Sequence, residues 1–226
     1  MTDLMLTRNT DKLRQEVAAH VAADSIVQGT YWDSENKRGC FIGCLAKNDD
    51  PAINEVTYGL PVMVQRIAEN IFEALPADEA KAFFAALPDA VSCDGKDLSK
   101  VGWQFLAAEL RSLPEQHEEV QAVINPVIAG MDLLVSGRVW STADEAAVWA
   151  ADATARAATR AARADAAADA ARAAWAAAWA ADAADATARA ATRAADDDAA
   201  YAARLRQRDL LLRLICEAPV VEVSRG

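Results

Sequence analysis

The residues best suited to chemistry are two cysteines in the passage Arg38-Gly39-Cys40-Phe41-Ile42-Gly43-Cys44. On a helix, a C-x₃-C spacing places both sulfurs on one face, where thiols can react or bind a metal. It is not the C-x₂-C spacing of a zinc knuckle or redox pair. Packing of small Gly and Cys residues at a tight helix contact explains the passage as well. We therefore expect no metal and no cofactor, and keep Cys40 and Cys44 as the candidates for a thiol or metal site.

Further metal ligands would have to come from His20, Cys93, His117 or Cys216. None of these residues belongs to a recognisable second pair of ligands. We expect His20 on a helix near the edge of the core. His117 lies among acidic residues in the first turns of a helix, as on a solvated surface. The chain contains no nucleophile elbow, phosphate-binding Gly loop, HExxH or EF-hand pattern. We assign no catalytic residue and expect a protein that is not an enzyme.

The charge of the chain argues against direct nucleic-acid binding. The formal net charge is −11, and residues 1–140 alone carry 21 acidic against 12 basic side chains. Without a basic stripe, the counterion release that dominates nucleic-acid affinity is missing. An acidic domain can instead occupy a site built for phosphate, so a nucleic-acid mimic remains an alternative, beside the simpler reading that the acidity serves solubility.

Helical spacing of apolar residues predicts an all-α domain over residues 1–137. Proline is expected to end one of its helices at Pro88 and to kink or divide another at Pro126. The predicted helices cover Asp11–Gln28, Pro61–Leu75, Asp78–Leu87, Leu98–Leu113 and a segment from Pro114 through Met131.

Residues 138–218 contain neither Gly nor Pro and form a predicted helical arm, followed by a tail over 219–226. From Ala143 to Ala203, 36 of 61 residues are alanine, the best helix former. The arm is either one long helix or a hairpin, with Asp196–Asp198 as the plausible break. It ends in an amphipathic helix expected to pack on other residues. Ala150–Ala162 recurs identically as Ala183–Ala195, by selection or by slippage in a low-complexity gene.

Large apolar side chains are rare in this arm, so they are the candidates for interaction. Trp175 and Trp179 lie one turn apart on one helix face and are costly to leave in water. Trp149 and Tyr201 complete the set. Small Ala side chains let helices approach closely, as in a coiled coil, so the arm can dock on the first domain, on a second copy or on a foreign protein.

No secretory signal is visible at the amino terminus, and no apolar stretch is long enough to span a bilayer. We therefore expect a cytoplasmic protein with reduced thiols and no membrane partner.

Several passages resemble a family of uncharacterised proteins from phages and bacterial genomes that have an Ala-rich helical tail. The resemblance covers most of residues 29–100 and the composition of the tail, but it implies no activity. It favours a mobile-element protein, and by analogy one that binds host machinery. The matching passages are Gly29-Thr30-Tyr31-Trp32, Gly39-Cys40-Phe41-Ile42-Gly43-Cys44, Tyr58-Gly59-Leu60-Pro61, Ile71-Phe72-Glu73-Ala74-Leu75-Pro76 and Asp97-Leu98-Ser99.

Together these observations favour a non-enzymatic interaction protein, phage or mobile-element derived, that binds itself as a homo-oligomer or binds a host protein through the arm. The first alternative is an acidic inhibitor that mimics nucleic acid at a host nuclease or defence complex. The second is a metal or thiol protein based on its cysteines.

Overall fold

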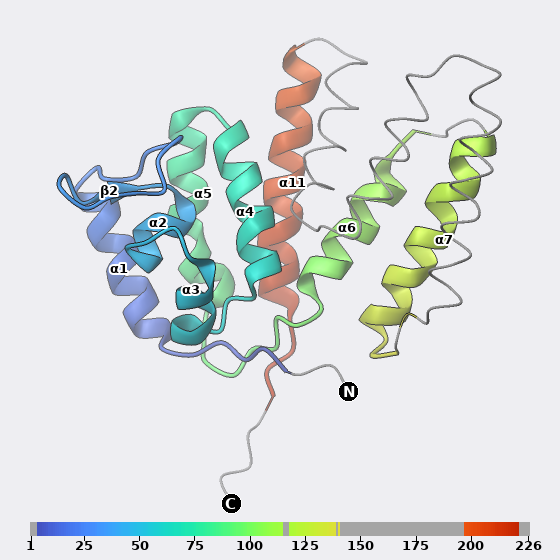
Figure 1. Cartoon of the computed structure of the whole chain (residues 1–226), viewed down its shortest axis with the longest axis horizontal. Coiled ribbons are helices and arrows are strands. Elements are labelled where there is room, and N and C mark those ends of the chain that lie inside the picture. Colours follow the sequence, from blue (N-terminus) through green and yellow to red (C-terminus); the bar gives the residue numbers. More distant parts are fainter. Residues whose placement is uncertain (1–3, 115–117, 139, 141–196, 222–226) are drawn as a thin grey trace, which may run out of the picture. The chain divides into compact units, whose positions relative to one another are not determined.

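The computed structural model describes residues 4–114, 118–138, 140 and 197–221, which are mostly helical (Figure 1). The expected all-α class is confirmed. One short antiparallel hairpin joins the helices, formed by β1 (Trp32–Asp33) and β2 (Arg38–Gly39). No helix in the described residues is long and apolar enough to cross a bilayer. The helices are α1 (Thr10–Ala22), α2 (Phe41–Ala46), α3 (Pro51–Tyr58), α4 (Val62–Ala74), α5 (Ala77–Val91), α6 (Val101–Ser112), α7 (Glu118–Val135) and α11 (Asp197–Glu217).

The chain divides into two compact units, and the division does not follow the order of the sequence. Residues 2–102 and 201–226 form one unit, called here the main unit. The described residues within 103–200 form the other, called the second unit. The main unit therefore contains most of α11, the amphipathic helix at the end of the arm.

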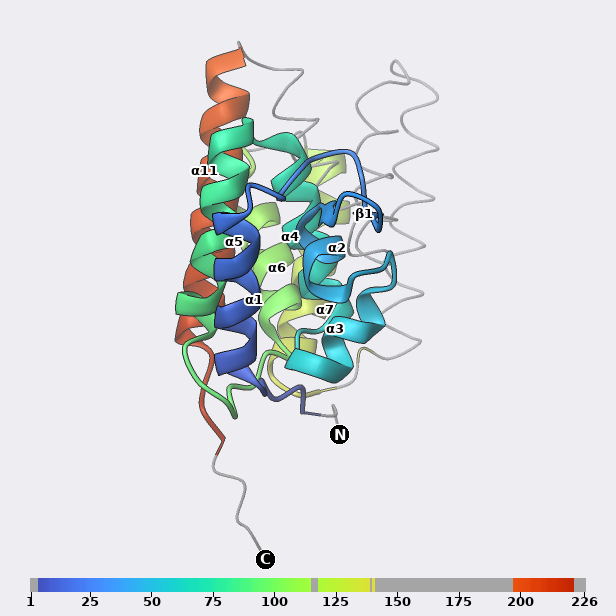
Figure 2. The same ribbon diagram turned by 90° about the vertical axis from the view of Figure 1, so that its left-hand side faces the viewer.

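The core of the main unit is built around phenylalanine rings. The ring of Phe41, the first residue of α2, lies 5.3 Å from that of Phe83 and 5.5 Å from that of Phe84, both on α5. Leu211 and Ile215 of α11 are buried and line the same interior as Phe41 and Phe83. Figure 2 shows α1, α5 and α11 in the main unit. The packing expected of the amphipathic helix is thus present, because its apolar face completes this core.

A short extended segment around Lys96 joins both ends of the chain to the middle of the main unit. On one side, the Thr7 amide donates to the Lys96 carbonyl oxygen at 2.9 Å. On the other, the Asp97 amide donates to the Pro219 carbonyl oxygen at 2.8 Å, and the Val221 amide donates to the Gly95 carbonyl oxygen at 2.8 Å. The backbone of this segment is therefore satisfied on both sides by residues far away in the sequence.

The Lys96 side chain is buried, with 4% of its surface exposed. Its ammonium group donates to the carbonyl oxygens of Ala90 at 3.0 Å and Cys216 at 2.7 Å. These carbonyl groups lie in the last turns of α5 and α11. The negative end of each helix dipole lies there, and the carbonyl groups have no amide donor within the helix. One cation therefore holds the C-terminal ends of two helices together.

A second buried polar contact ties α3 to α4. The Asn54 side-chain amide donates to Gln65 Oε1 at 3.0 Å, and Gln65 Nε2 donates to the carbonyl oxygens of Pro51 at 2.9 Å and Leu60 at 2.7 Å. Both side chains are almost fully buried. Their bonds fix the turn between the two helices because each broken bond would leave a buried polar group unsatisfied.

The second unit contains α7 and α6 from Trp103 onward. Arg111 on α6 pairs with Asp132 on α7 at 2.5 Å. The ring of Trp140 lies against the α-carbon of Gly130, since a Cβ atom there would be 2.5 Å from the ring. The last described residue before the Ala-rich stretch is therefore packed on α7.

Two expectations about proline need correction. Helix α5 does not end before Pro88 but continues to Val91, and the Ser92 amide donates to the Pro88 carbonyl oxygen at 2.8 Å. Of the two effects expected of Pro126, division of the helix is wrong, because α7 runs from Glu118 to Val135. Proline removes one amide donor, and burial of the apolar face on which it lies offsets that loss.

Replacing Lys96 by methionine should lower the free energy of unfolding by roughly 2–4 kcal/mol, because two carbonyl groups lose a charged donor. Urea unfolding followed by circular dichroism measures this change. The matched control is Lys100→Met, at a half-buried residue that forms neither of these two bonds. Equal losses in the two variants would contradict the role given to Lys96.

Candidate functional site

The two candidate cysteines lie at the start of α2 and inside it. Cys40 precedes the helix in an extended conformation, and Cys44 belongs to it. Both thiols are buried, with 1% and 0% of the residue exposed. They lie one turn apart, since the Cys44 amide donates to the Cys40 carbonyl oxygen at 3.0 Å, but in the interior and not on an exposed helix face.

The glycines of the same passage are explained by one close backbone approach. A Cβ atom on Gly43 would lie 1.4 Å from the carbonyl oxygen of Tyr31, and one on Gly39 would lie 2.2 Å from the same atom. The Cys40 amide donates to that oxygen at 3.2 Å. The tight contact inferred from small residues thus exists, but it is made with the backbone that enters the hairpin, not with another helix.

Cys44 is held by backbone oxygens. Its Sγ atom donates to the carbonyl oxygen of Gly39 at 3.2 Å and lies 3.8 Å from that of Ser25. Burial, together with the charge of Glu69, raises the pKa of the Cys44 thiol to about 12. Burial also raises the pKa of the Cys40 thiol, and the neighbouring Glu69 adds to the effect. Both groups are protonated near neutral pH and are poor nucleophiles and poor metal ligands in that state.

The structure brings Cys40 together with two carboxylates. One potential ligand atom from each of Cys40, Glu69 and Glu73 lies within 4.8 Å of the others, and this group does not include Cys44. Glu69 Oε2 accepts from the Ile42 amide at 3.1 Å, and Glu73 Oε2 accepts from the Gly29 amide at 2.8 Å. Both carboxylates therefore hold backbone amides, Glu69 at the start of α2 and Glu73 in the loop before the hairpin. The cluster is therefore explained by hydrogen bonds that join α4 to α2 and to the loop before the hairpin.

Burial raises the pKa of Glu69 above its ordinary value, and hydrogen bonds from Cys40 and Ile42 oppose the rise. Glu69 is 7% exposed on the buried face of α4. The Cys40 thiol thus forms a hydrogen bond with the Glu69 carboxyl group in the interior, where water solvates neither group well.

A second candidate site is a hollow at the C-terminal end of α1. It has a volume of about 490 Å³ and includes His20, Ser25 and Trp32 among its lining residues. His20 Nδ1 lies 2.7 Å from Ser25 Oγ. A Ser–His contact of this length is also found in nucleophilic catalysis, so its origin must be considered.

The contact between His20 and Ser25 follows from the way in which α1 ends. The Ser25 amide donates to the His20 carbonyl oxygen at 3.1 Å, and the Asp24 amide donates to that of Val21 at 3.2 Å. Asp24 between them is left-handed, with φ 48°. These features define a Schellman cap, which brings the residue after the left-handed position back over the last turn. The geometry of the cap alone therefore accounts for the Ser–His contact.

Burial lowers the pKa of His20, partly opposed by a hydrogen bond with the backbone of Cys44. The imidazole is accordingly neutral near pH 7. It meets the Trp32 ring edge to face, with centroids 6.0 Å apart. As expected from the sequence, His20 lies on α1 at the edge of the core, with 8% of its surface exposed.

Three of the four interaction candidates of the arm lie outside the described residues: Trp149, Trp175 and Trp179. Tyr201 is described. It is 39% exposed on α11, and its hydroxyl group donates to Glu79 Oε1 of α5 at 3.3 Å. Tyr201 therefore lies on the surface of the main unit, near the Arg208–Glu79 ion pair.

Sequence reasoning missed two polar residues on the buried face of α4, Gln65 and Glu69. The sequence does contain a pattern that indicates their burial, because both lie among apolar residues at helical spacing. Buried polar groups need partners, so their position on that face predicts hydrogen bonds within the core.

No family model, curated protein or solved structure matches the chain. The resemblance to phage and bacterial proteins therefore remains an expectation drawn from short passages.

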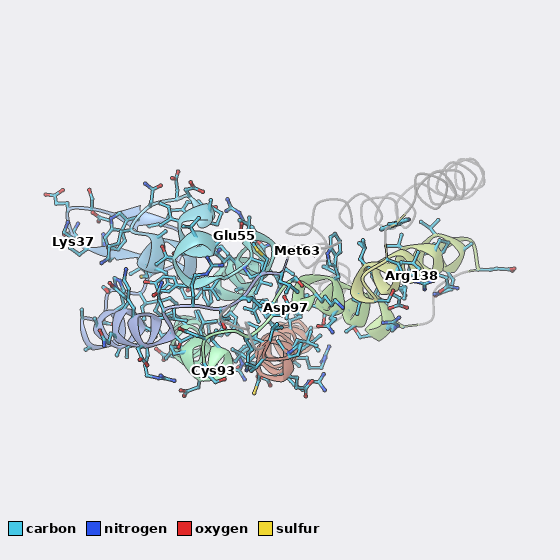
Figure 3. The ribbon with its side chains drawn as sticks, turned by 90° about the horizontal axis from the view of Figure 1, so that it is seen from below. Lys37, Glu55, Met63, Cys93, Asp97 and Arg138 are labelled. Carbon is cyan, nitrogen blue, oxygen red and sulfur yellow. The ribbon has the colours of Figure 1, made fainter. Side chains whose placement is uncertain are left out.

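The four cysteines should separate into two classes of reactivity towards iodoacetamide at pH 8. Cys93 and Cys216 are exposed, whereas the buried Cys40 and Cys44 have raised pKa values. Figure 3 labels Cys93 among the side chains of the main unit. Mass spectrometry of the native protein should find two modified cysteines at early times and four after unfolding in urea. Rapid modification of Cys40 or Cys44 in the folded protein would contradict their assignment as packed, protonated thiols.

Replacing Glu69 by glutamine should remove one pH dependence of stability. Because the folded pKa of Glu69 lies above its ordinary value of 4.5, its contribution is present below pH 4.5 and is lost as pH rises through the folded pKa. At pH 8 the Glu69→Gln variant should be at least as stable as the parent, since the amide oxygen can still accept from Ile42.

Urea unfolding of both proteins at pH 4.5 and pH 8 tests this expectation, with Glu35→Gln as the control on the exposed hairpin. A large loss of stability in the Glu69→Gln variant at pH 8 would show that a charged carboxylate is needed there. Such a result would reopen the case for a metal ion at Cys40, Glu69 and Glu73.

Proposed function

We propose that the protein is a non-enzymatic interaction protein whose Ala-rich stretch, residues 141–196, binds a second copy of the chain or a host protein. The observation that carries this proposal is the attachment of that stretch at both ends. Trp140 packs on Gly130 of α7 just before it. Just after it, α11 supplies Leu211 and Ile215 to the core of the main unit.

A stretch attached in this way is an insertion between folded parts, not a tail beyond them. Insertions of more than fifty residues are tolerated at the surface of a folded unit because loop-closure entropy grows slowly with length. Its alanine content gives it little large apolar surface with which to form an independent core. The exceptions that favour a role in binding are Trp175 and Trp179, since tryptophan is enriched at the centres of protein interfaces.

The buried polar groups of the main unit support the same proposal. Glu69, Gln65 and Lys96 each bind backbone groups and thereby fix the ends of helices. These are the contacts of a scaffold that holds its helices in place. We extend the proposal to a phage or mobile-element origin, on the resemblance described above, and to the cytoplasmic location expected from the sequence.

The test is a deletion designed to preserve the scaffold. Residues 143–196 are replaced by a flexible Gly/Ser linker of about 20 residues, which keeps Trp140 and all of α11. Circular dichroism and a urea titration establish that the main unit still folds. Light scattering then gives the oligomeric mass, and pull-down from a host lysate with mass spectrometry gives the partners.

The proposal predicts that the deletion abolishes self-association or the capture of a specific partner. A Trp175→Ala/Trp179→Ala double variant should weaken the same binding by about tenfold or more. An Arg156→Ala/Arg189→Ala double variant in the same stretch is the control and should retain it. Unchanged mass and unchanged partners after the deletion would contradict the proposal.

The acidic inhibitor is the alternative that the same experiment can reveal. Its basis is the excess of 21 acidic over 12 basic side chains in residues 1–140. It predicts a partner that binds the deletion variant as well as the full chain. Such binding should weaken steeply with added salt and compete with DNA or RNA.

A further inference from the structure

The hollow beside the Schellman cap of α1 combines three consecutive elements of the main unit, within residues 16–47. Helix α1 contributes Glu16 and His20, the hairpin contributes Trp32 and Lys37, and Lys47 follows the end of α2. Its volume of about 490 Å³ falls within the range of roughly 300–1,000 Å³ found for small-molecule sites.

The inner wall of the hollow is apolar and aromatic. Trp32 is half-buried, and a Cβ atom on Gly39 would lie 3.1 Å from its ring, so the absent side chain lets the indole lie close to the β2 strand. The His20 imidazole meets the indole edge to face. Ala19 of α1 and Ala23, its C-cap residue, line the hollow with small side chains. This wall suits a flat apolar group, which would bury surface against the indole.

The polar groups at the inner end are already engaged, whereas cations lie at the rim. His20 and Ser25 bind each other. Lys47 pairs with Glu16 at 3.2 Å, and in the described part of the chain no ion pair includes Lys37. Figure 3 shows Lys37 at the outer edge of the hairpin. Among the residues that line the hollow, two lysines are present with one glutamate, on a chain whose net charge is −11. A local excess of this sign attracts an anion.

We propose that this hollow binds a small organic anion that carries a flat apolar ring. The ring lies against Trp32 and the imidazole edge, and the carboxylate lies between Lys37 and Lys47. Lys47 exchanges part of its contact with Glu16 for the ligand. This site lies in the main unit and is independent of the binding proposed for residues 141–196.

The test uses 2-naphthoate as the anionic probe and 2-naphthylmethanol as a neutral probe of similar shape. Isothermal titration calorimetry and saturation-transfer NMR on the full chain measure both. Naphthoate should bind about tenfold more tightly than the alcohol, and a Lys37→Gln/Lys47→Gln variant should bring the two affinities together. Trp32→Leu should weaken both probes. Lys12→Gln, on the exposed side of α1, is the matched charge control and should change neither.

A space-filling variant separates this hollow from other apolar surfaces. Ala19 and Ala18 are both exposed on α1, but only Ala19 lines the hollow. Ala19→Phe should abolish binding of naphthoate, whereas Ala18→Phe should leave it unchanged, and both variants should melt like the parent. The proposal is overturned if naphthoate does not bind at millimolar concentration, or if it binds no better than the alcohol. Equal effects of the two phenylalanine variants would likewise overturn it.

Discussion

The main unit depends on a buried ammonium group at the point where distant parts of the chain meet. Lys96 holds the C-terminal carbonyl groups of α5 and α11, while its backbone and that of its neighbours pair with residues 5–7 on one side and 219–221 on the other. A cation is favourable there because two helix dipoles present their negative ends and because carbonyl groups replace the lost water. The phenylalanine core gives the unit its hydrophobic stabilisation, and the Lys96 contacts join the C-terminal ends of two of the helices that enclose it. The Arg208–Glu79 ion pair and the backbone bonds of Pro219 and Val221 add further directional contacts to the apolar ones, which are not directional.

Helical periodicity is sufficient to predict the all-α class, the approximate positions of α4, α6 and α7, and the start of α1. The predicted end of α1 at Gln28 is wrong, because the helix stops at Ala22 in a Schellman cap. Apolar spacing reports one face of a helix directly, and these helices have such faces. The same reasoning failed at Pro88, where tertiary burial outweighs the local cost of a missing amide. It also missed the hairpin, whose two strands have only two residues each and are held by the close approach of Tyr31 to two glycines. Such an approach depends on backbone positions that no local pattern encodes.

The candidate sites show the same limit. The Gly-Cys passage was conspicuous in the sequence, yet its cysteines are interior side chains and its glycines make room for a carbonyl group. Glu69 and Lys96, which organise that interior, lie among ordinary residues and acquire their roles only through partners 27 and 120 positions away. The hollow beside α1 could not be foreseen either. His20, Trp32 and Lys47 come together because a Schellman cap and a hairpin fold back over the same end of one helix.

The contribution of α11 to the main unit has a consequence during synthesis. A ribosome that has completed residues 2–102 must still add about a hundred more before Leu211 and Ile215 are made, which takes roughly 5–20 s at ordinary rates of synthesis. During that interval the interior lined by Phe41, Leu60 and Phe83 lacks the helix that closes it. A nascent chain in this state exposes apolar surface that chaperones recognise, and a chain truncated within the Ala-rich stretch would retain that exposure permanently. The arrangement thus links folding of the first half to completion of the whole polypeptide.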